Sequence, residues 1–148
     1  LGNFTVAASF GNTHGVYKPG NVKLRPKILR DSQAEIMAQR GTGAAPIDFV
    51  FHGGSGSSAE EIREAVSYGV IKMNIDTDTQ WAFCHPIKTY MDEKDAYLQR
   101  QIGNPEGDDK PNKKHIDPRG WMHRGEKGMA ARLVEAFDHL GALGKFEF

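Results

Sequence analysis

The sequence has 148 residues, and its 19 Lys and Arg residues balance its 19 Asp and Glu residues, so the formal net charge is zero. Nucleic-acid-binding domains and proteins that bind membranes through a basic surface usually carry an excess of positive charge, so this balance argues against both. Hydrophobic residues make up 39% of the chain and charged residues 26%, which argues against intrinsic disorder and favours a folded domain.

The cysteine content and the start of the chain bear on its setting. Cys84 is the only cysteine, and neither a run of 18 apolar residues nor a secretory signal pattern occurs. The expected compartment is therefore the cytosol. The chain begins at Leu1 rather than at Met and soon enters the apolar run 4–10, which favours its being part of a longer protein.

Three short apolar runs predict β-strands at 4–10, 47–51 and 70–75. Their nearly continuous apolar character is typical of parallel strands that are covered on both faces. Helical segments are expected between them, at 25–41 and at 57–68. This order predicts an α/β protein with a parallel sheet and right-handed crossovers, because parallel strands need a connection of a dozen or more residues.

The ends of these two helices carry recognisable signals. Pro26 suits the first turn of the first helix, and Gly41 is expected to stop it. The second helix begins with a capping box, formed either by Ser57 with Glu60 or by Ser58 with Glu61.

The remaining third of the chain predicts helices around a loop. Residues 76–98 read as a helix that Pro86 should kink or split. The polar stretch 103–114, which contains two glycines and two prolines, predicts a long surface loop. Asp117 and Pro118 then begin a last helix, whose expected apolar face comprises Met129, Leu133, Phe137 and Leu140.

Clusters of glycine and polar residues follow the three predicted strands, at 11–15, 52–57 and 74–78. Ligands of parallel α/β proteins bind at the carboxyl ends of the strands, so these clusters form the candidate site. The glycines of 52–57 would let backbone N–H groups approach an anion, and the next helix directs its positive end to the same place. A phosphate suits this arrangement, and a glycine turn with a serine cap explains the pattern as well.

His14 and His52 each come just after a strand. Neighbouring strands lie about 4.8 Å apart, so the two imidazoles could converge on one ion, for which zinc is the natural choice. The alternative is a pair of hydrogen-bonded structural histidines. The four other histidines lack such a setting and are expected at the surface or at the edge of the core: His85, His115, His123 and His139.

Other polar residues have two interpretations each. Asn74, Asp76 and Thr77 could hydrogen-bond the hydroxyls of a substrate, although Asp76 or Thr77 could equally cap the next helix. Lys18 and Arg119 are candidate phosphate partners or ordinary solvated cations. The pair Lys113–Lys114 is most simply a solvated pair of charges.

Five segments together resemble the class II, zinc-dependent fructose-bisphosphate aldolases, and in particular their class IIA subgroup. They are Ala8–Gly20, Val50–Ser57, Lys72–Asp78, Gly103–Pro105, and Pro111–Lys114 with Asp117–Arg119. The resemblance runs nearly from end to end. It implies a TIM (β/α)8 barrel, to which this chain supplies the last three βα units in 1–93 and a loop with a C-terminal helical extension in 94–148.

The resemblance also implies an activity and a set of site residues. Such enzymes reversibly cleave fructose 1,6-bisphosphate to dihydroxyacetone phosphate and glyceraldehyde 3-phosphate in glycolysis and gluconeogenesis, and zinc stabilises the enediolate. His14 and His52 would be zinc ligands, and Arg119 would reach the far phosphate from a neighbouring subunit. The residues implied to hold dihydroxyacetone phosphate are Gly15, Lys18, Gly53, Gly54, Ser55, Asn74, Ile75, Asp76 and Thr77.

Further expectations follow from the same resemblance. They are a monovalent cation, Na⁺ or K⁺, near the backbone of 14–15 and 52–53, sugar phosphates as small-molecule partners, and a homodimer of the full-length enzyme. The catalytic aspartate, a further histidine ligand and a loop glutamate would precede Leu1, so this chain would contain no catalytic residue and an incomplete metal site.

Two alternatives remain open at this point. A tagatose-bisphosphate aldolase shares the zinc and phosphate motifs, and the isolated chain could be a non-catalytic phosphate-binding module. The segment 103–114 and the motif around Arg119 favour the fructose enzyme.

Overall fold

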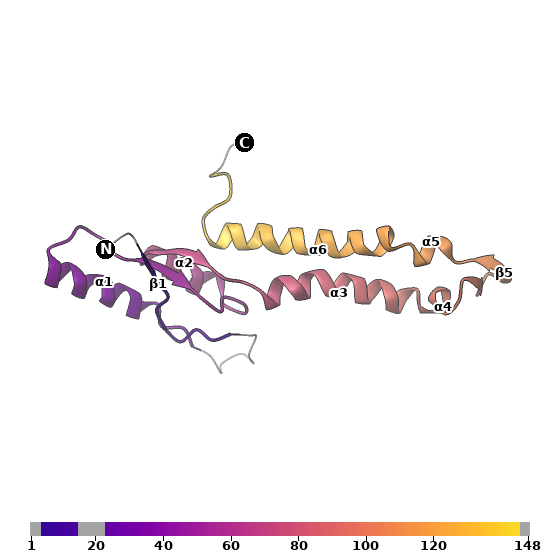
Figure 1. The fold of residues 1–148 in the computed structure, drawn as a ribbon, viewed down its shortest axis with the longest axis horizontal. Helices are drawn as coiled ribbons and strands as arrows, with labels where there is room; N and C mark the ends of the chain where they lie inside the picture. The colour runs from indigo at the N-terminus through magenta and orange to yellow at the C-terminus, as the bar shows by residue number, and fades with distance from the viewer. Residues whose placement is uncertain (1–3, 15–22, 146–148) are drawn as a thin grey trace. The chain divides into compact units, whose positions relative to one another are not determined.

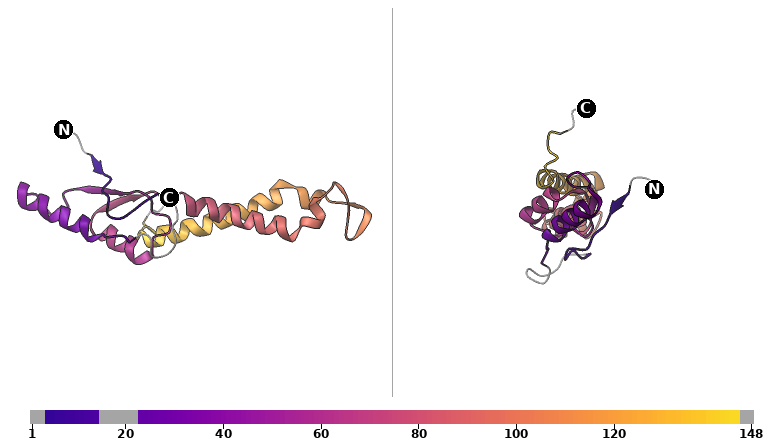
Figure 2. Two further views of the ribbon diagram at one scale, coloured as in Figure 1. Left: turned by 90° about the horizontal axis from the view of Figure 1, so that it is seen from below. Right: turned by 90° about the vertical axis from the view of Figure 1, so that its left-hand side faces the viewer.

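The computed structural model describes residues 4–14 and 23–145, which belong to two units (Figures 1 and 2). The sheet unit lies within 1–78 and 135–148, and the helical unit comprises 79–134. None of the helices in the described ranges combines the length and the apolar character needed to cross a membrane. The elements in chain order are β1 (Thr5–Val6), α1 (Lys27–Arg40), β2 (Asp48–Phe51), α2 (Ala59–Ser67), β3 (Val70–Met73), α3 (Thr77–Glu93), α4 (Asp95–Leu98), β4 (Ile102–Asn104), β5 (Gly107–Pro111), α5 (Lys113–Ile116) and α6 (Pro118–His139).

A parallel sheet of order β1-β2-β3 organises the sheet unit, which confirms the predicted α/β class. The last partners are Val6 with Phe49 between β1 and β2, and Phe51 with Met73 between β2 and β3. The first strand is shorter than predicted, because two residues of the run 4–10 are paired. After Val6 the chain continues beyond the end of β2 without further strand pairing to β2.

The two helices that connect the strands begin and end at the predicted signals. Gly41 ends α1 with φ of 61°, in the left-handed region that glycine adopts readily. Of the two possible capping boxes, the structure forms the one in which the Ser58 hydroxyl accepts from the Glu61 amide and the Glu61 carboxylate accepts from the Ser58 amide. The first turn of α2 is therefore anchored by its own side chains.

The core of the sheet unit lies between the sheet and its helices, and Figure 2 shows α1 and α2 on the same side of the strands. The buried side chains that form it are Phe10, Leu29, Phe49, Phe51, Ile62, Ala65 and Val70. Gln33 of α1 is also buried, and its amide bonds the Ile47 N–H and carbonyl and the Tyr68 carbonyl. This amide satisfies backbone groups at the point where the chain enters β2 and β3.

Helices α3 and α6 run side by side in the helical unit (Figures 1 and 2). Of the two effects predicted for Pro86, a kink or a split of the first of these helices, the split does not occur, because α3 continues through Pro86 to Glu93 and the interruption falls at Lys94, before α4. Proline removes the hydrogen bond to the carbonyl four residues earlier, here Ala82. Gly128 of α6 packs against that carbonyl and against the Pro86 ring, so the altered stretch of helix lies against its neighbour.

The prediction of a long loop at 103–114 is also wrong, because β4 and β5 form an antiparallel hairpin and α5 follows it. Asn112 holds the base of this hairpin. It is fully buried, its Nδ2 donates to the carbonyls of Arg100 and Gly103, and its Oδ1 accepts from Asn104. Polar composition did not indicate this hairpin, because the hydrogen bonds of Asn112 join residues 8 to 12 positions apart in the chain.

The predicted apolar face of the last helix is correct in part. Leu140 packs against the core of the sheet unit, but Leu133 and Phe137 remain 39% and 48% exposed. The buried positions of α6 are Gly125 and Ala136. Small residues let two helix backbones approach closely, so the contact with α3 is made at glycine rather than at the large side chains.

We expect Gly128→Ala to destabilise the packing of α3 against α6, because the added Cβ would overlap the Ala82 carbonyl oxygen and lie 2.8 Å from Cγ of Pro86. Overpacking of this kind costs about 1–3 kcal/mol, measurable by denaturant unfolding of the full-length protein. Gly120→Ala is the matched control on the same helix, since a Cβ there meets nothing within 4 Å. Equal effects of the two substitutions would contradict this packing.

Candidate substrate and metal site

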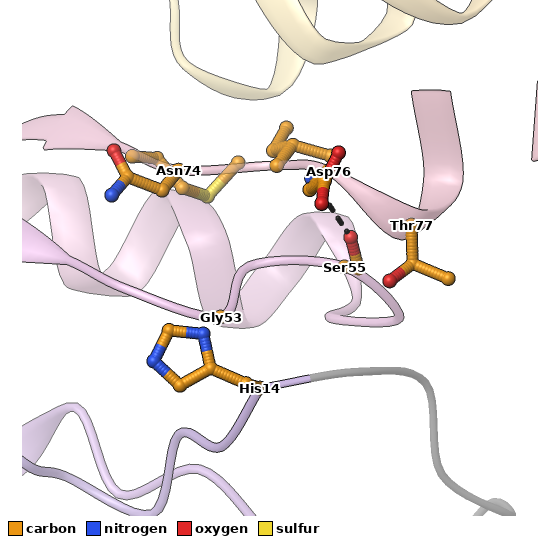
Figure 3. Close-up of a pocket in the computed structure, with 8 residues that line it drawn as sticks. His14, Gly53, Ser55, Asn74, Asp76 and Thr77 are labelled. Carbon is orange, nitrogen blue, oxygen red and sulfur yellow. Dashed lines mark hydrogen bonds between the residues drawn. The ribbon is translucent and has the colours of Figure 1, made fainter. Parts of the chain in front are cut away.

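A pocket of about 510 Å³ lies where the loop after β1 meets the carboxyl ends of β2 and β3 (Figure 3). Residues from all three predicted clusters therefore meet at one place, as expected from parallel strands whose carboxyl ends share one edge of a sheet. The residues that line it are His14, Gly53, Ser55, Met73, Asn74, Ile75, Asp76 and Thr77.

The two candidate metal ligands lie next to each other. The ring centroids of His14 and His52 are 6.0 Å apart with an interplanar angle of 55°. Zn–N bonds are about 2.0–2.1 Å long, so two imidazoles on one ion must come this close. Within 4–14 and 23–145, no group of three His, Cys, Asp or Glu residues could hold a metal ion. The donors fit two of the three protein ligands that catalytic zinc sites use.

Asn74 links the His52 ring to the end of β3. Its Nδ2 lies 2.9 Å from Nδ1 of His52, and its backbone N–H donates to the Phe51 carbonyl at 2.8 Å. A hydrogen-bonded contact on one ring nitrogen sets the orientation of an imidazole. Figure 3 shows Asn74 and His14 on opposite sides of the pocket, with Gly53 between them. The His52 ring is therefore oriented by a residue that also lines the pocket.

The two glycines after His52 are needed for close contacts. Gly53 has φ of 64°, and a Cβ there would overlap the carbonyl oxygen of Thr13. Gly54 is buried rather than lining the pocket, and a Cβ there would lie 2.8 Å from Cγ of Met73. Side chains at these two positions would separate the loop after β2 from its neighbours on either side.

Ser55 connects the same loop to the start of α3. Its hydroxyl oxygen accepts from the backbone N–H of Asp76 at 3.4 Å (Figure 3). It also accepts from the backbone N–H of Asp78 at 3.3 Å. The carboxylate of Asp78 accepts in return from the Gly56 N–H at 3.2 Å. Since α3 begins at Thr77, a hydroxyl from a neighbouring loop satisfies amides at this helix start.

The remaining predicted site residues fall outside this pocket or outside the described residues. Gly15 and Lys18 lie outside the described residues. Arg119 belongs to the helical unit, where its guanidinium bonds the Asp117 carboxylate at 2.6 Å. Hydrogen bonds from the Arg119 side chain and backbone lower the pKa of Asp117 to about 2.

A second basic feature of the helical unit is a pocket of about 360 Å³ lined by Pro111, Lys113, Lys114 and Asp117. The sequence predicts a solvated pair of lysines here, and both are exposed while they line this concave surface. Burial lowers the pKa of the neighbouring His115, and the charges of Lys114 and Lys94 lower it further. The hairpin β4–β5 and α5, which sequence reasoning missed, create this concavity.

Three residues at the main pocket were given no individual role by the sequence analysis. Met73 lines it, Asp78 bonds the loop after β2, and Asn12 bonds the loop after β2 from the loop after β1. Asp78 lay at the edge of a segment already singled out. Asn12 lay within one, but nothing in a single sequence distinguishes an asparagine that bridges two loops from one in an ordinary turn.

Comparison with solved structures defines the class of fold. A crystal structure of fructose-bisphosphate aldolase from Campylobacter jejuni matches 97% of this chain with a TM-score of 0.86 at 59% identity, and the match covers 41% of that chain. The YdjI aldolase from Escherichia coli shares the fold at a TM-score of 0.58 and 20% identity. The chain is thus an α/β protein whose parallel βα units form part of a (β/α)8 barrel.

Sequence comparison identifies the family. The family of class-II fructose-bisphosphate aldolases matches residues 1–145, and the chain belongs to it. The chain is 60% identical over 141 residues to the fructose-bisphosphate aldolase of Haemophilus influenzae and 58% identical over 140 residues to the class 2 enzyme of Escherichia coli. Each match covers 95% of this chain and 39% of the relative, so the chain spans about two fifths of their length.

We expect Arg119→Gln to raise the pKa of Asp117 from about 2 toward its ordinary value of 3.8, because the guanidinium is the largest cause of the shift. A carboxylate with a lowered pKa stabilises the folded state above pH about 4, and this contribution is lost as the pH falls through 2. The titration is measured by NMR of ¹³C-labelled aspartate carboxyl groups. Arg124→Gln, which removes a partner of Glu93, is the control and should leave Asp117 unchanged.

Proposed function

We propose that this chain is the C-terminal portion of a zinc-dependent aldolase that reversibly cleaves fructose 1,6-bisphosphate to dihydroxyacetone phosphate and glyceraldehyde 3-phosphate. The observation that supports it most is the pocket shared by His14, the glycine loop after β2 and residues 74–77. The names of the relatives support the same substrate. In the cell this reaction would serve glycolysis and gluconeogenesis.

His14 and His52 would hold the zinc ion, whose role when bound is to polarise the substrate carbonyl as a Lewis acid. The adjacent imidazoles support this assignment. A third protein ligand and the residue that moves the proton would come from sequence that the relatives have and this chain does not contain. We assign no catalytic acid or base to the described residues.

The loops at the pocket would bind dihydroxyacetone phosphate. Backbone N–H groups of Gly53 and Ser55, with Gly15 and Lys18, would take its phosphate, because such a loop and the start of α2 present positive dipoles. The resemblance also implied Gly54 as a substrate-binding residue, but Gly54 is buried and its N–H donates to the Asn74 carbonyl at 2.9 Å, so it would support the loop instead. Asn74, Ile75, Asp76 and Thr77 would fix the hydroxyl and carbonyl end of the substrate. Arg119 would neutralise the second phosphate, for which its planar guanidinium is suited.

The proposal extends to the organisation of the whole enzyme. Residues 1–93 would be the last three βα units of one barrel domain, and 94–148 its C-terminal extension. A monovalent cation, Na⁺ or K⁺, would bind the backbone of the two histidine loops. The full-length protein would work in the cytoplasm as a homodimer.

Substituting either histidine tests the assignment of the metal ligands. We expect His14→Ala and His52→Ala in the full-length protein to lose bound zinc, measured by elemental analysis, and to lose aldol cleavage by at least about 100-fold, since a metal ligand is removed in each. His123→Ala, an exposed histidine on α6, should retain both. Retention of zinc and activity in both histidine variants would overturn the proposed function.

The chain of 148 residues by itself tests whether the remaining barrel is required. Among the described residues, Phe4 is 70% exposed and Ile71 61% exposed, and β1 and β3 are the edges of the sheet. Open edges and exposed apolar side chains favour association, so we expect oligomers or aggregates by size-exclusion chromatography and no cleavage of fructose 1,6-bisphosphate. Turnover by the isolated chain would contradict this.

A further inference from the structure

The distance between His14 and His52 is not set by the strands that precede them. The ladder between β1 and β2 ends at the pair Val6 and Phe49, before either histidine. Phe10, after β1, and Phe51, at the end of β2, then contact edge to face with ring centroids 4.8 Å apart, which aligns these two segments inside the core. Beyond this pair, the two loops need another interaction to keep their histidines at a constant spacing.

Asn12 supplies a hydrogen bond at this point. Its Nδ2 donates to the backbone carbonyl of His52 at 2.8 Å, and its Oδ1 accepts from the backbone N–H of Phe10 at 2.9 Å. The bond to the His52 carbonyl joins the two loops. The bond from the Phe10 N–H holds the side chain against the segment that follows β1. The amide is thus fixed at both ends, two residues before one histidine and on the carbonyl of the other.

The chemistry of these two bonds selects asparagine at this position. One partner is an N–H and requires an acceptor, whereas the other is a carbonyl and requires a donor. Aspartate has the same shape but offers acceptors alone when ionised, so it would set a negative oxygen against the His52 carbonyl. Alanine would leave both backbone groups without this partner.

A close backbone contact lies beside the bridge. Gly53 follows His52, and its Cα packs against the Thr13 carbonyl so closely that a Cβ would overlap the oxygen. Thr13 lies between Asn12 and His14. The two loops therefore touch on the residue before one histidine and on the residue after the other, and Asn12 holds them together.

We propose that Asn12 is a positioning residue that sets the spacing of His14 and His52 and thereby the affinity of the site for zinc. It is not among the residues that line the pocket, and it acts through the His52 backbone. The inference rests on the proposed function, because it takes the two histidines as zinc ligands. Loss of a residue that orients metal ligands typically lowers metal affinity by about 10–100-fold.

The test compares zinc affinity in the full-length protein, measured by competition with a chromophoric chelator, for the wild type, Asn12→Asp and Asn12→Ala. We expect affinity to fall by about 10–100-fold in both variants. The circular dichroism spectrum and unfolding temperature of the metal-free protein should stay close to those of the wild type. Gln39→Glu makes the same amide-to-carboxylate exchange at an exposed position of α1 and should leave zinc affinity unchanged.

The outcomes separate this inference from the proposed function. A wild-type protein that binds no zinc and cleaves no sugar bisphosphate would overturn both. A wild type that does both, with variants of unchanged zinc affinity, would overturn the positioning role alone. If Asn12→Asp fails to fold, Asn12→Ala decides, since it introduces no charge. A fall in unfolding temperature without a fall in zinc affinity would show a structural role and also overturn the proposal.

Discussion

The pairing of β2 with a parallel strand on each side is the constraint on which the pocket depends. Phe49 and Phe51 of β2 are buried against the helices, and the strand bonds β1 and β3 at once. Parallel strands end at the same edge, so the loops after all three are brought together without any attraction between the polar residues that they carry. The position of the pocket therefore follows from the burial of the apolar side chains of β2 in the core.

Close backbone contacts then order the loops that this pairing gathers. Gly53 lies against the Thr13 carbonyl, and Gly54 lies against Met73, so the loop after β2 is held between its two neighbours. Ser55 adds the bonds to the first amides of α3. Such contacts hold residues 52–56 in one arrangement, and the loop needs that constancy if its backbone N–H groups are to bind a phosphate.

Close contacts at glycine also order the helical unit, where they lie between two helices. Gly125 packs against Phe83 and Gly128 against Ala82, so α3 and α6 approach where α6 has no side chains. Asn112 at the hairpin resembles Asn12 between the histidine loops, since each side-chain amide bonds backbone groups of other residues, and Asn112 is fully buried. In both units, glycines and asparagine side chains hold segments together, and in the sheet unit an apolar core holds the strands and helices.

Much of the fold could be predicted because its signals are local. The apolar runs, Gly41 and the capping box of Ser58 act within a few residues, so the sequence by itself determined the α/β class, the order of elements as far as β3 and the clusters that line the pocket. The tertiary structure decided the rest: the continuity of α3 at Pro86, the hairpin at β4 and β5, the buried face of α6 and the bridge made by Asn12. Each depends on a partner distant in the chain, and the free energy of such a contact is invisible to propensity and pattern, which see only neighbouring residues.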